Sequence, residues 1–123
     1  ATIKTSSRKI AADKFFQTPK SETERETALK PNEILTEIRV PLSGAKNATY
    51  EVRHRKGLDW PYVTASVAKT ATGTKIVLGH VAPTPVIVTG NDPGAGAKPL
   101  SDNAYKVPMV KTAVKRALAA ASN

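Results

Sequence analysis

Short segments in which apolar and polar residues alternate are the most regular pattern in the chain. The alternation runs through residues 33–40, 48–56, 63–71 and 75–81, and a β-branched run follows at 86–89. A period of two places the apolar side chains on one face of a half-buried strand. Short stretches with glycine or proline separate several of these runs, so we predict an antiparallel meander of four or five strands.

The first forty residues contain weaker signals. Residues 2–5 and 8–10 are typical of a small terminal hairpin, and Phe15 and Phe16 should anchor the following segment on a core. Residues 17–30 are polar and predict an extended connector. In the run 33–40, the alternation assigns Ile34, Ile38 and Val40 to the buried face, with the charged residues at 33, 37 and 39 opposite.

The end of the chain predicts one amphipathic helix over residues 103–121. Apolar residues recur there at three- and four-residue steps, and Asp102 or Asn103 could cap the helix start. Pro108 is tolerable in the first turn only. The apolar stripe must cover one face of the sheet. The predicted fold class is therefore α+β, an antiparallel meander with helices packed on one face.

The composition limits the kinds of site that the chain can build from its own residues. The 123 residues suit one domain, and the absence of cysteine excludes disulfides, thiolate zinc sites and cysteine-ligated iron–sulfur clusters within this chain. His54 and His80 fall on different predicted strands, without acidic residues at ligand spacing. Ser66, His80 and Asp59 form a catalytic triad on paper only, because no nucleophile-elbow sequence surrounds the serine.

The formal net charge of +9 makes an anionic partner a second possibility. Residues 53–56 (RHRK) form one dense basic cluster, and the predicted helix carries a looser one. Both are read either as solvated faces or as sites for nucleic acid or another anion bound through charge. Aromatic residues are only 5% of the chain, and no RNA-binding aromatic string is present. No run approaches the roughly 18 apolar residues of a membrane helix.

One segment combines groups that suit a flat ligand. Residues 55–62 (RKGLDWPY) hold the only Trp, a Tyr, two cations, a carboxylate and a Gly between two predicted strands. Such a loop could lay an aromatic ring against a ligand, with Lys56 or Asp59 hydrogen-bonding its polar edge. The alternative interpretation is a loop whose Trp60 covers the end of the sheet.

Four ordered motifs add a family resemblance. They are residues 29–41 (LKPNEILTEIRVP), 50–68, 78–85 (LGHVAPTP) and 100–106 (LSDNAYK), the last followed by 115–118 (KRAL). In this order they resemble the C-terminal domain of the FAD-binding subunit in the xanthine dehydrogenase / carbon monoxide dehydrogenase family of molybdenum hydroxylases. His80 stands where the family has a glycine.

The resemblance implies an electron-transfer role without catalysis by this chain alone. Residues 1–16 would be the trailing end of the preceding FAD domain and residues 17–123 the C-terminal domain. The loop carrying Lys56, Asp59, Trp60 and Tyr62 would approach the flavin ring. FAD would be held mainly by the preceding domain. The molybdenum cofactor and iron–sulfur clusters would belong to partner subunits, in a cytoplasmic or periplasmic complex.

Two departures qualify the resemblance. The Gly-rich FAD domain is missing, so the chain alone should hold FAD weakly. The family has a helix-bearing stretch where this chain has only residues 86–98, and part of the sheet should therefore be exposed. Ala1 stands where a start methionine would, so we expect a trimmed chain or a piece of a longer one. A third possibility is a scaffold without any flavin contact.

Overall fold

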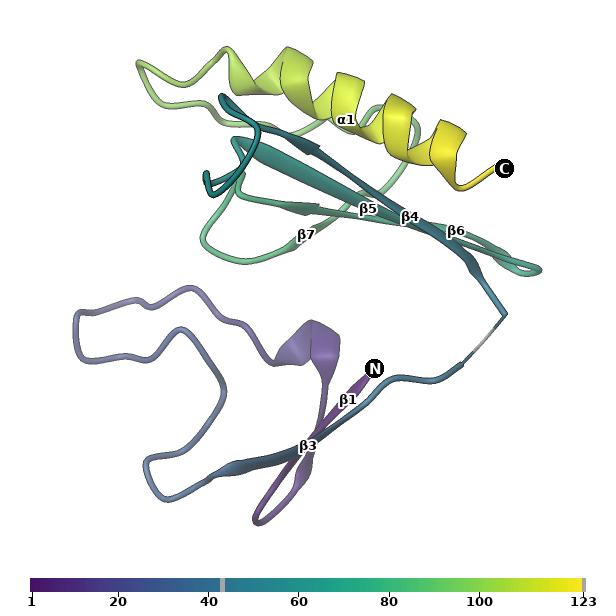
Figure 1. Ribbon diagram of the computed structural model, residues 1–123. Coiled ribbons are helices and arrows are strands. Elements are labelled where there is room, and N and C mark those ends of the chain that lie inside the picture. Colours follow the sequence, from purple (N-terminus) through teal and green to yellow (C-terminus); the bar gives the residue numbers. More distant parts are fainter. Residues whose placement is uncertain (43, 123) are drawn as a thin grey trace. The chain divides into compact units, whose positions relative to one another are not determined.

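The chain folds into two compact units, which are described separately. The computed structural model describes residues 1–42 and 44–122, and the division falls between Ala1–Ser43 and Gly44–Asn123 (Figure 1). The first unit therefore contains both residues 1–16 and the polar connector that follows them. The boundary of a parent FAD domain at residue 16 stays a prediction.

The N-terminal unit is a three-stranded antiparallel sheet. Its strands are β1 (Thr2–Thr5), β2 (Lys9–Ala11) and β3 (Leu35–Arg39), in the order β2-β1-β3, and a short 3-10 helix spans Ala12–Lys14. The terminal hairpin is thus confirmed. Its small core contains Ile3, Ile10 and Phe15, whereas Phe16 is 51% exposed, so only one of the two Phe residues is a buried anchor.

Strand β3 departs from its sequence pattern. It pairs with β1 and does not join the meander. The predicted buried face is also wrong: Ile34, Ile38 and Val40 are 72%, 58% and 69% exposed, and Leu35 packs on the core instead. The register shifts between Lys4, which faces Glu37, and Thr5, which faces Leu35. Burial keeps a period of two on both sides of this bulge, because Glu33, Leu35 and Glu37 are less exposed than their neighbours at 34, 36 and 38. The covered face is therefore the one opposite to the prediction.

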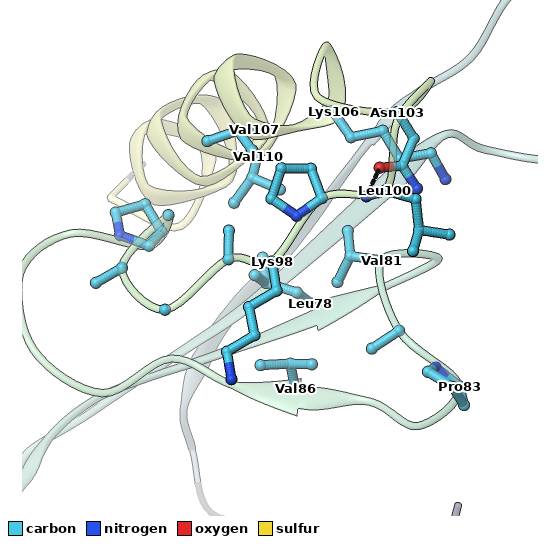
Figure 2. A pocket seen from close by; sticks show the side chains of 17 residues that line it. Leu78, Val81, Pro83, Val86, Lys98, Leu100, Asn103, Lys106, Val107 and Val110 are labelled. Carbon is cyan, nitrogen blue, oxygen red and sulfur yellow. Dashed lines mark hydrogen bonds between the residues drawn. The ribbon is translucent and has the colours of Figure 1, made fainter.

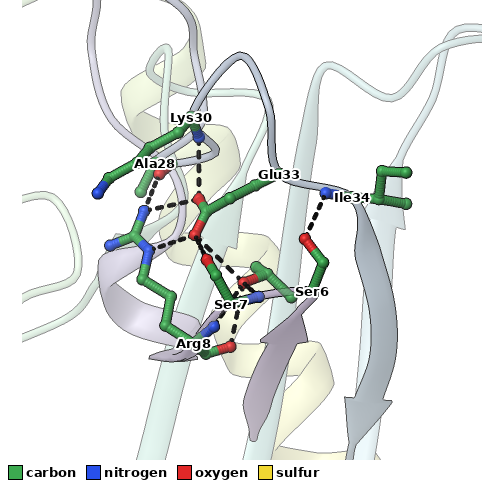
Figure 3. Close-up of polar contacts among 8 residues, drawn as sticks. Ser6, Ser7, Arg8, Ala28, Lys30, Glu33 and Ile34 are labelled. Carbon is green, nitrogen blue, oxygen red and sulfur yellow. Dashed lines mark hydrogen bonds and ion pairs between the residues drawn. The ribbon is translucent and has the colours of Figure 1, made fainter.

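A buried carboxylate ties the N-terminal unit together (Figure 3). Glu33 Oε1 accepts from Arg8 Nε at 2.7 Å and from Ser7 Oγ at 2.5 Å, and Oε2 accepts from Arg8 Nη2 at 3.0 Å and Lys30 N at 2.9 Å. Arg8 Nη2 also donates to Ala28 O at 2.5 Å. These bonds, those from Arg8 first, hold the pKa of Glu33 far below its ordinary value. The carboxylate thus joins the β1–β2 turn to the segment before β3.

Replacing Glu33 by Gln should destabilise the N-terminal unit at neutral pH, because the amide removes the anion that Arg8 faces. The pKa of Glu33 is lowered on folding, so its stabilisation is complete above the unfolded value of about 4.3 and is lost as pH falls toward the folded value. Hydrogen–deuterium exchange of β1–β3 from pH 7 to acid should show this loss in wild type and a flatter profile in E33Q.

The matched control is Glu37→Gln, which removes a carboxylate of the same sheet. The Glu37 side chain is 39% exposed, against 2% for Glu33, so water screens its ion pairs and the change should be much smaller. Equal protection of wild type and E33Q across the pH range would contradict the role of Glu33.

The C-terminal unit is a four-stranded meander with one helix. Strands β4 (Lys46–Val52), β5 (Val63–Thr70), β6 (Gly73–Gly79) and β7 (Val86–Ile87) pair antiparallel in the order β4-β5-β6-β7. Helix α1 (Lys106–Ala120) lies across one face of this sheet (Figure 1). The α+β prediction is confirmed, with a single covering helix in the described residues. Within that same part of the chain, no helix has the length and apolarity that a bilayer crossing requires.

The predicted apolar stripe of α1 is confirmed as the contact with the sheet. Val110, Ala113, Val114 and Ala117 are buried, and they pack with the buried face of β5 and with Leu78 of β6. The predicted cap is wrong. Tyr105 holds the N-cap position without a side-chain hydrogen bond, and the Oδ1 atom of Asn103 accepts from Leu100 N at 2.7 Å, one turn earlier. Pro108 lies in the first turn, as expected.

Replacing Leu78 by Ala should destabilise the C-terminal unit by about 2 kcal/mol or more, because a buried leucine leaves a cavity when truncated. Leu58→Ala is the matched control. That side chain is fully exposed on a loop, so its removal should change stability by less than about 0.5 kcal/mol. Chemical denaturation followed by far-UV circular dichroism measures both variants, and equal losses would contradict the assigned core.

Candidate ligand-binding loop

The connection between β4 and β5, residues 53–62, contains its own hydrogen bonds, and we call it the β4–β5 loop. Tyr62 N donates to Val52 O at 2.8 Å, which closes its base. Inside the loop, Arg53 Nη1 donates to Gly57 O at 2.9 Å, and Arg55 N donates to Asp59 Oδ2 at 3.2 Å. Gly57 has a φ of 123°, a conformation that favours glycine. These bonds hold the loop in one shape.

Trp60 points its indole to solvent from this loop. It is 83% exposed, and its ring centroid lies 6.3 Å from that of His80, tilted by 52°. Both residues line a hollow of about 490 Å³ together with Asp59 and Arg53, which we call the Trp60 hollow. The alternative, in which Trp60 covers the end of the sheet, is wrong because the indole is exposed.

His80 is fixed at the rim of the Trp60 hollow in an uncommon backbone conformation. Its φ is 63°, in the left-handed region, and it is the one residue other than glycine with a positive φ in the described chain. The ring Nδ1 lies 3.0 Å from Thr64 Oγ1, and Lys106 Nζ of α1 donates to the His80 carbonyl at 3.0 Å. The helix and the sheet thus both hold this residue.

The four predicted site residues share the loop but do not share one hollow. Asp59 and Trp60 line the Trp60 hollow, whereas Lys56 lines a second concavity. Tyr62 packs between rings. It stacks on His54 at 6.4 Å and meets Tyr105 edge-on at 6.0 Å. Sequence reasoning did not place His80 or Tyr105 at this loop. A signal for His80 existed: when the two adjacent predicted strands pair, Gly79 faces Thr64, and His80 is the next residue after Gly79.

The second concavity is strongly basic and is called the basic concavity below. It has a volume of about 1230 Å³ and lies between β4, the β4–β5 loop and α1. Arg116 of α1 is placed over the Tyr50 ring, with its Cζ 4.9 Å from the ring centroid, and bonds the Tyr50 hydroxyl. Its charged lining comprises Glu51, Arg53, Arg55, Lys56 and Arg116.

A third, apolar hollow lies beside β6, β7 and α1 (Figure 2). Its volume is about 480 Å³, and Leu78, Val86, Val107 and Val110 contribute to its wall. Residues 88–98 contain no helix, and residues 93–98 of this stretch line the hollow. The loop is held to α1 by Asp92, which accepts from Lys111 Nζ at 3.4 Å and from Gly94 N at 2.9 Å.

The described residues contain no cluster of three acidic, histidine or cysteine side chains that could hold a metal ion. The catalytic triad considered from the sequence, Ser66, His80 and Asp59, is not assembled either. Each of its three residues is bonded to a different partner. Ser66 Oγ lies 3.0 Å from Thr49 Oγ1, and His80 Nδ1 lies 3.0 Å from Thr64 Oγ1. Asp59 Oδ2 accepts from Arg55 N. The arrangement can stack rings, donate hydrogen bonds and neutralise anions.

Comparison with family models, with curated proteins and with solved structures finds no match. The α+β class and the geometry of the three hollows therefore rest on the structure of this chain alone.

Trp60 is the only Trp, so its fluorescence reports directly on the loop. We expect emission typical of an indole in water, with little shift when the chain is unfolded. A blue-shifted emission that moves to longer wavelength on unfolding would show that the indole is buried.

Proposed function

We propose that this chain completes the flavin pocket and subunit interface of a molybdenum hydroxylase, as the C-terminal domain of its FAD-binding subunit. The observation that supports this proposal most directly is the exposure of Trp60, an 83% exposed indole on a loop with its own internal hydrogen bonds. Contiguous exposed apolar surface marks interaction sites, and the exposed Leu58 adjoins Trp60 in the same hollow.

The chemistry of the loop suits one edge of a flat ring system. An indole offers a rigid apolar face for stacking, at low conformational entropy cost. Asp59 lies beside it in the Trp60 hollow and can accept a hydrogen bond through the carboxylate oxygen that Arg55 N leaves free. Lys56 supplies a donor on the other side of the loop, and Tyr62 holds the base of the loop against Tyr105.

The conformation of His80 supports the resemblance from an independent direction. The motif at residues 78–85 has a glycine at this position in the family, and the chain adopts a φ of 63° here. Glycine adopts this region without the steric penalty that a side chain meets. A backbone that requires a left-handed residue at this turn explains why a glycine would be the usual choice.

The chain supplies only part of a cofactor site in this proposal. Flavin, when bound, takes up and passes on electrons, and a separate FAD domain would hold most of it. The residues of this chain would cover the ring, exclude water from it and fix its orientation. Iron–sulfur and molybdenum centres would belong to partner subunits, since this chain has no cysteine to ligate a cluster.

The test combines this chain with a separately produced FAD domain of such a subunit and follows flavin fluorescence. Stacking of Trp60 on the ring should quench the emission, and Trp60→Ala should abolish most of that quenching. Trp60→Phe should retain part of it. Leu100→Ala, which removes another exposed apolar side chain of the same unit outside the loop, is the matched control and should behave as wild type. Unchanged fluorescence with wild type and W60A alike would refute the proposal.

A further inference from the structure

The geometry of the basic concavity points to a second binding site, for a nucleoside polyphosphate. This inference does not rest on the proposed flavin role, because its decisive residues are Arg55, Arg116 and Tyr105 and not Trp60. It concerns a single ligand that carries both phosphate groups and an aromatic base.

The charges in this concavity are unbalanced. Four cationic side chains line it, against one carboxylate, Glu51, and that carboxylate is paired with Arg53. Over the described residues, Arg55, Lys56 and Arg116 have no carboxylate within ion-pair distance. Three unneutralised cations on one concave surface repel one another, and an anion of two or more charges would relieve that repulsion.

Guanidinium groups recognise phosphate especially well, since their planar fork donates two parallel hydrogen bonds. Arg116 is already oriented for such a contact. Its guanidinium lies on the Tyr50 ring and bonds the Tyr50 hydroxyl through Nη1, which leaves other N–H groups for a ligand.

An aromatic surface adjoins these cations. Tyr105 is 48% exposed and lines the concavity, and its position is set by the edge-on contact with Tyr62. His54 lines the same wall and is stacked on Tyr62. A base can stack on such rings while its phosphates reach the cations, the combination that proteins use for nucleotides.

The confinement of the cations and rings to one concavity favours one small ligand over a polymer. The cations and rings gather in a single concavity of about 1230 Å³, a volume somewhat above the usual range for small-molecule sites. A single-stranded nucleic acid would need a basic groove that follows its backbone over several nucleotides. Such a polymer is therefore treated as the competing outcome.

Isothermal titration calorimetry of the full chain with ADP, at low salt and without magnesium, tests the assignment. We expect saturable 1:1 binding of ADP, with pyrophosphate and adenosine each at least about tenfold weaker. Arg55→Gln should weaken ADP binding by about tenfold, the usual effect of losing a charge-assisted hydrogen bond. Arg116→Gln should weaken it at least as much.

Lys75→Gln is the matched control, because it removes one positive charge from an exposed residue of β6 outside the concavity. It should change ADP affinity by less than about twofold. Since Arg116 contacts Tyr50, a thermal melt checks folding of R116Q, while the exposed and unpaired Arg55 gives a variant free of that concern.

Three results would overturn the inference. The first is no saturable binding of ADP. The second is pyrophosphate binding as tight as that of ADP, which would leave a bare anion site. The third is equal weakening by R55Q and K75Q together with tighter binding of a random oligonucleotide, which would indicate attraction by net charge alone.

Discussion

The apolar stripe of α1 has to be covered, and one face of the β4–β7 meander covers it within the same unit. Ala113 and Ala117 are fully buried, so small side chains allow the helix to approach β5 closely. This docking also determines what surrounds the β4–β5 loop. Lys106 and Arg116 belong to α1 and Tyr105 is its N-cap residue, and each contacts a residue of the sheet or its loops. The basic concavity exists because the helix packs where it does.

The loop itself follows from the strand pairing. Val52 and Val63 face each other across β4 and β5, so the ten residues between them must leave the sheet and return. A loop of ten residues is too short to fold back over its own central residues. The hydrogen bonds of Arg53 and Asp59 are made within the loop. Trp60 is left without a protein surface to cover it. Its exposure is thus a consequence of topology as much as of composition.

Strands β5 and β6 could be predicted from alternation because one of their faces lies under α1 and the other under no helix. The same reasoning failed for β3, because alternation alone does not say which face is covered. Glu33 is buried by its bonds to Arg8 and Leu35 packs on the core, so Ile34 and Ile38 face outward. A sequence pattern does not reveal an ion pair that buries the charged face. The helix start was misplaced for a similar reason, since Asn103 satisfies Leu100 N in the preceding turn. Residues 55–62 could be chosen as a candidate site from their chemistry, but their division between two hollows depends on α1.

The charges of the Trp60 hollow and of the basic concavity differ because of Arg53, which lies between them. Its side chain lines both the Trp60 hollow and the basic concavity, its charge is neutralised by Glu51, and its Nη1 donates to the Gly57 carbonyl. The Trp60 hollow then contains two carboxylates and one guanidinium, with an indole and no unpaired cation. The basic concavity retains all the unpaired cations of the loop. One loop therefore presents an apolar face suited to a ring on one side and a cationic face suited to phosphate on the other, and the two faces select different ligand chemistries because Arg53 is neutralised between them.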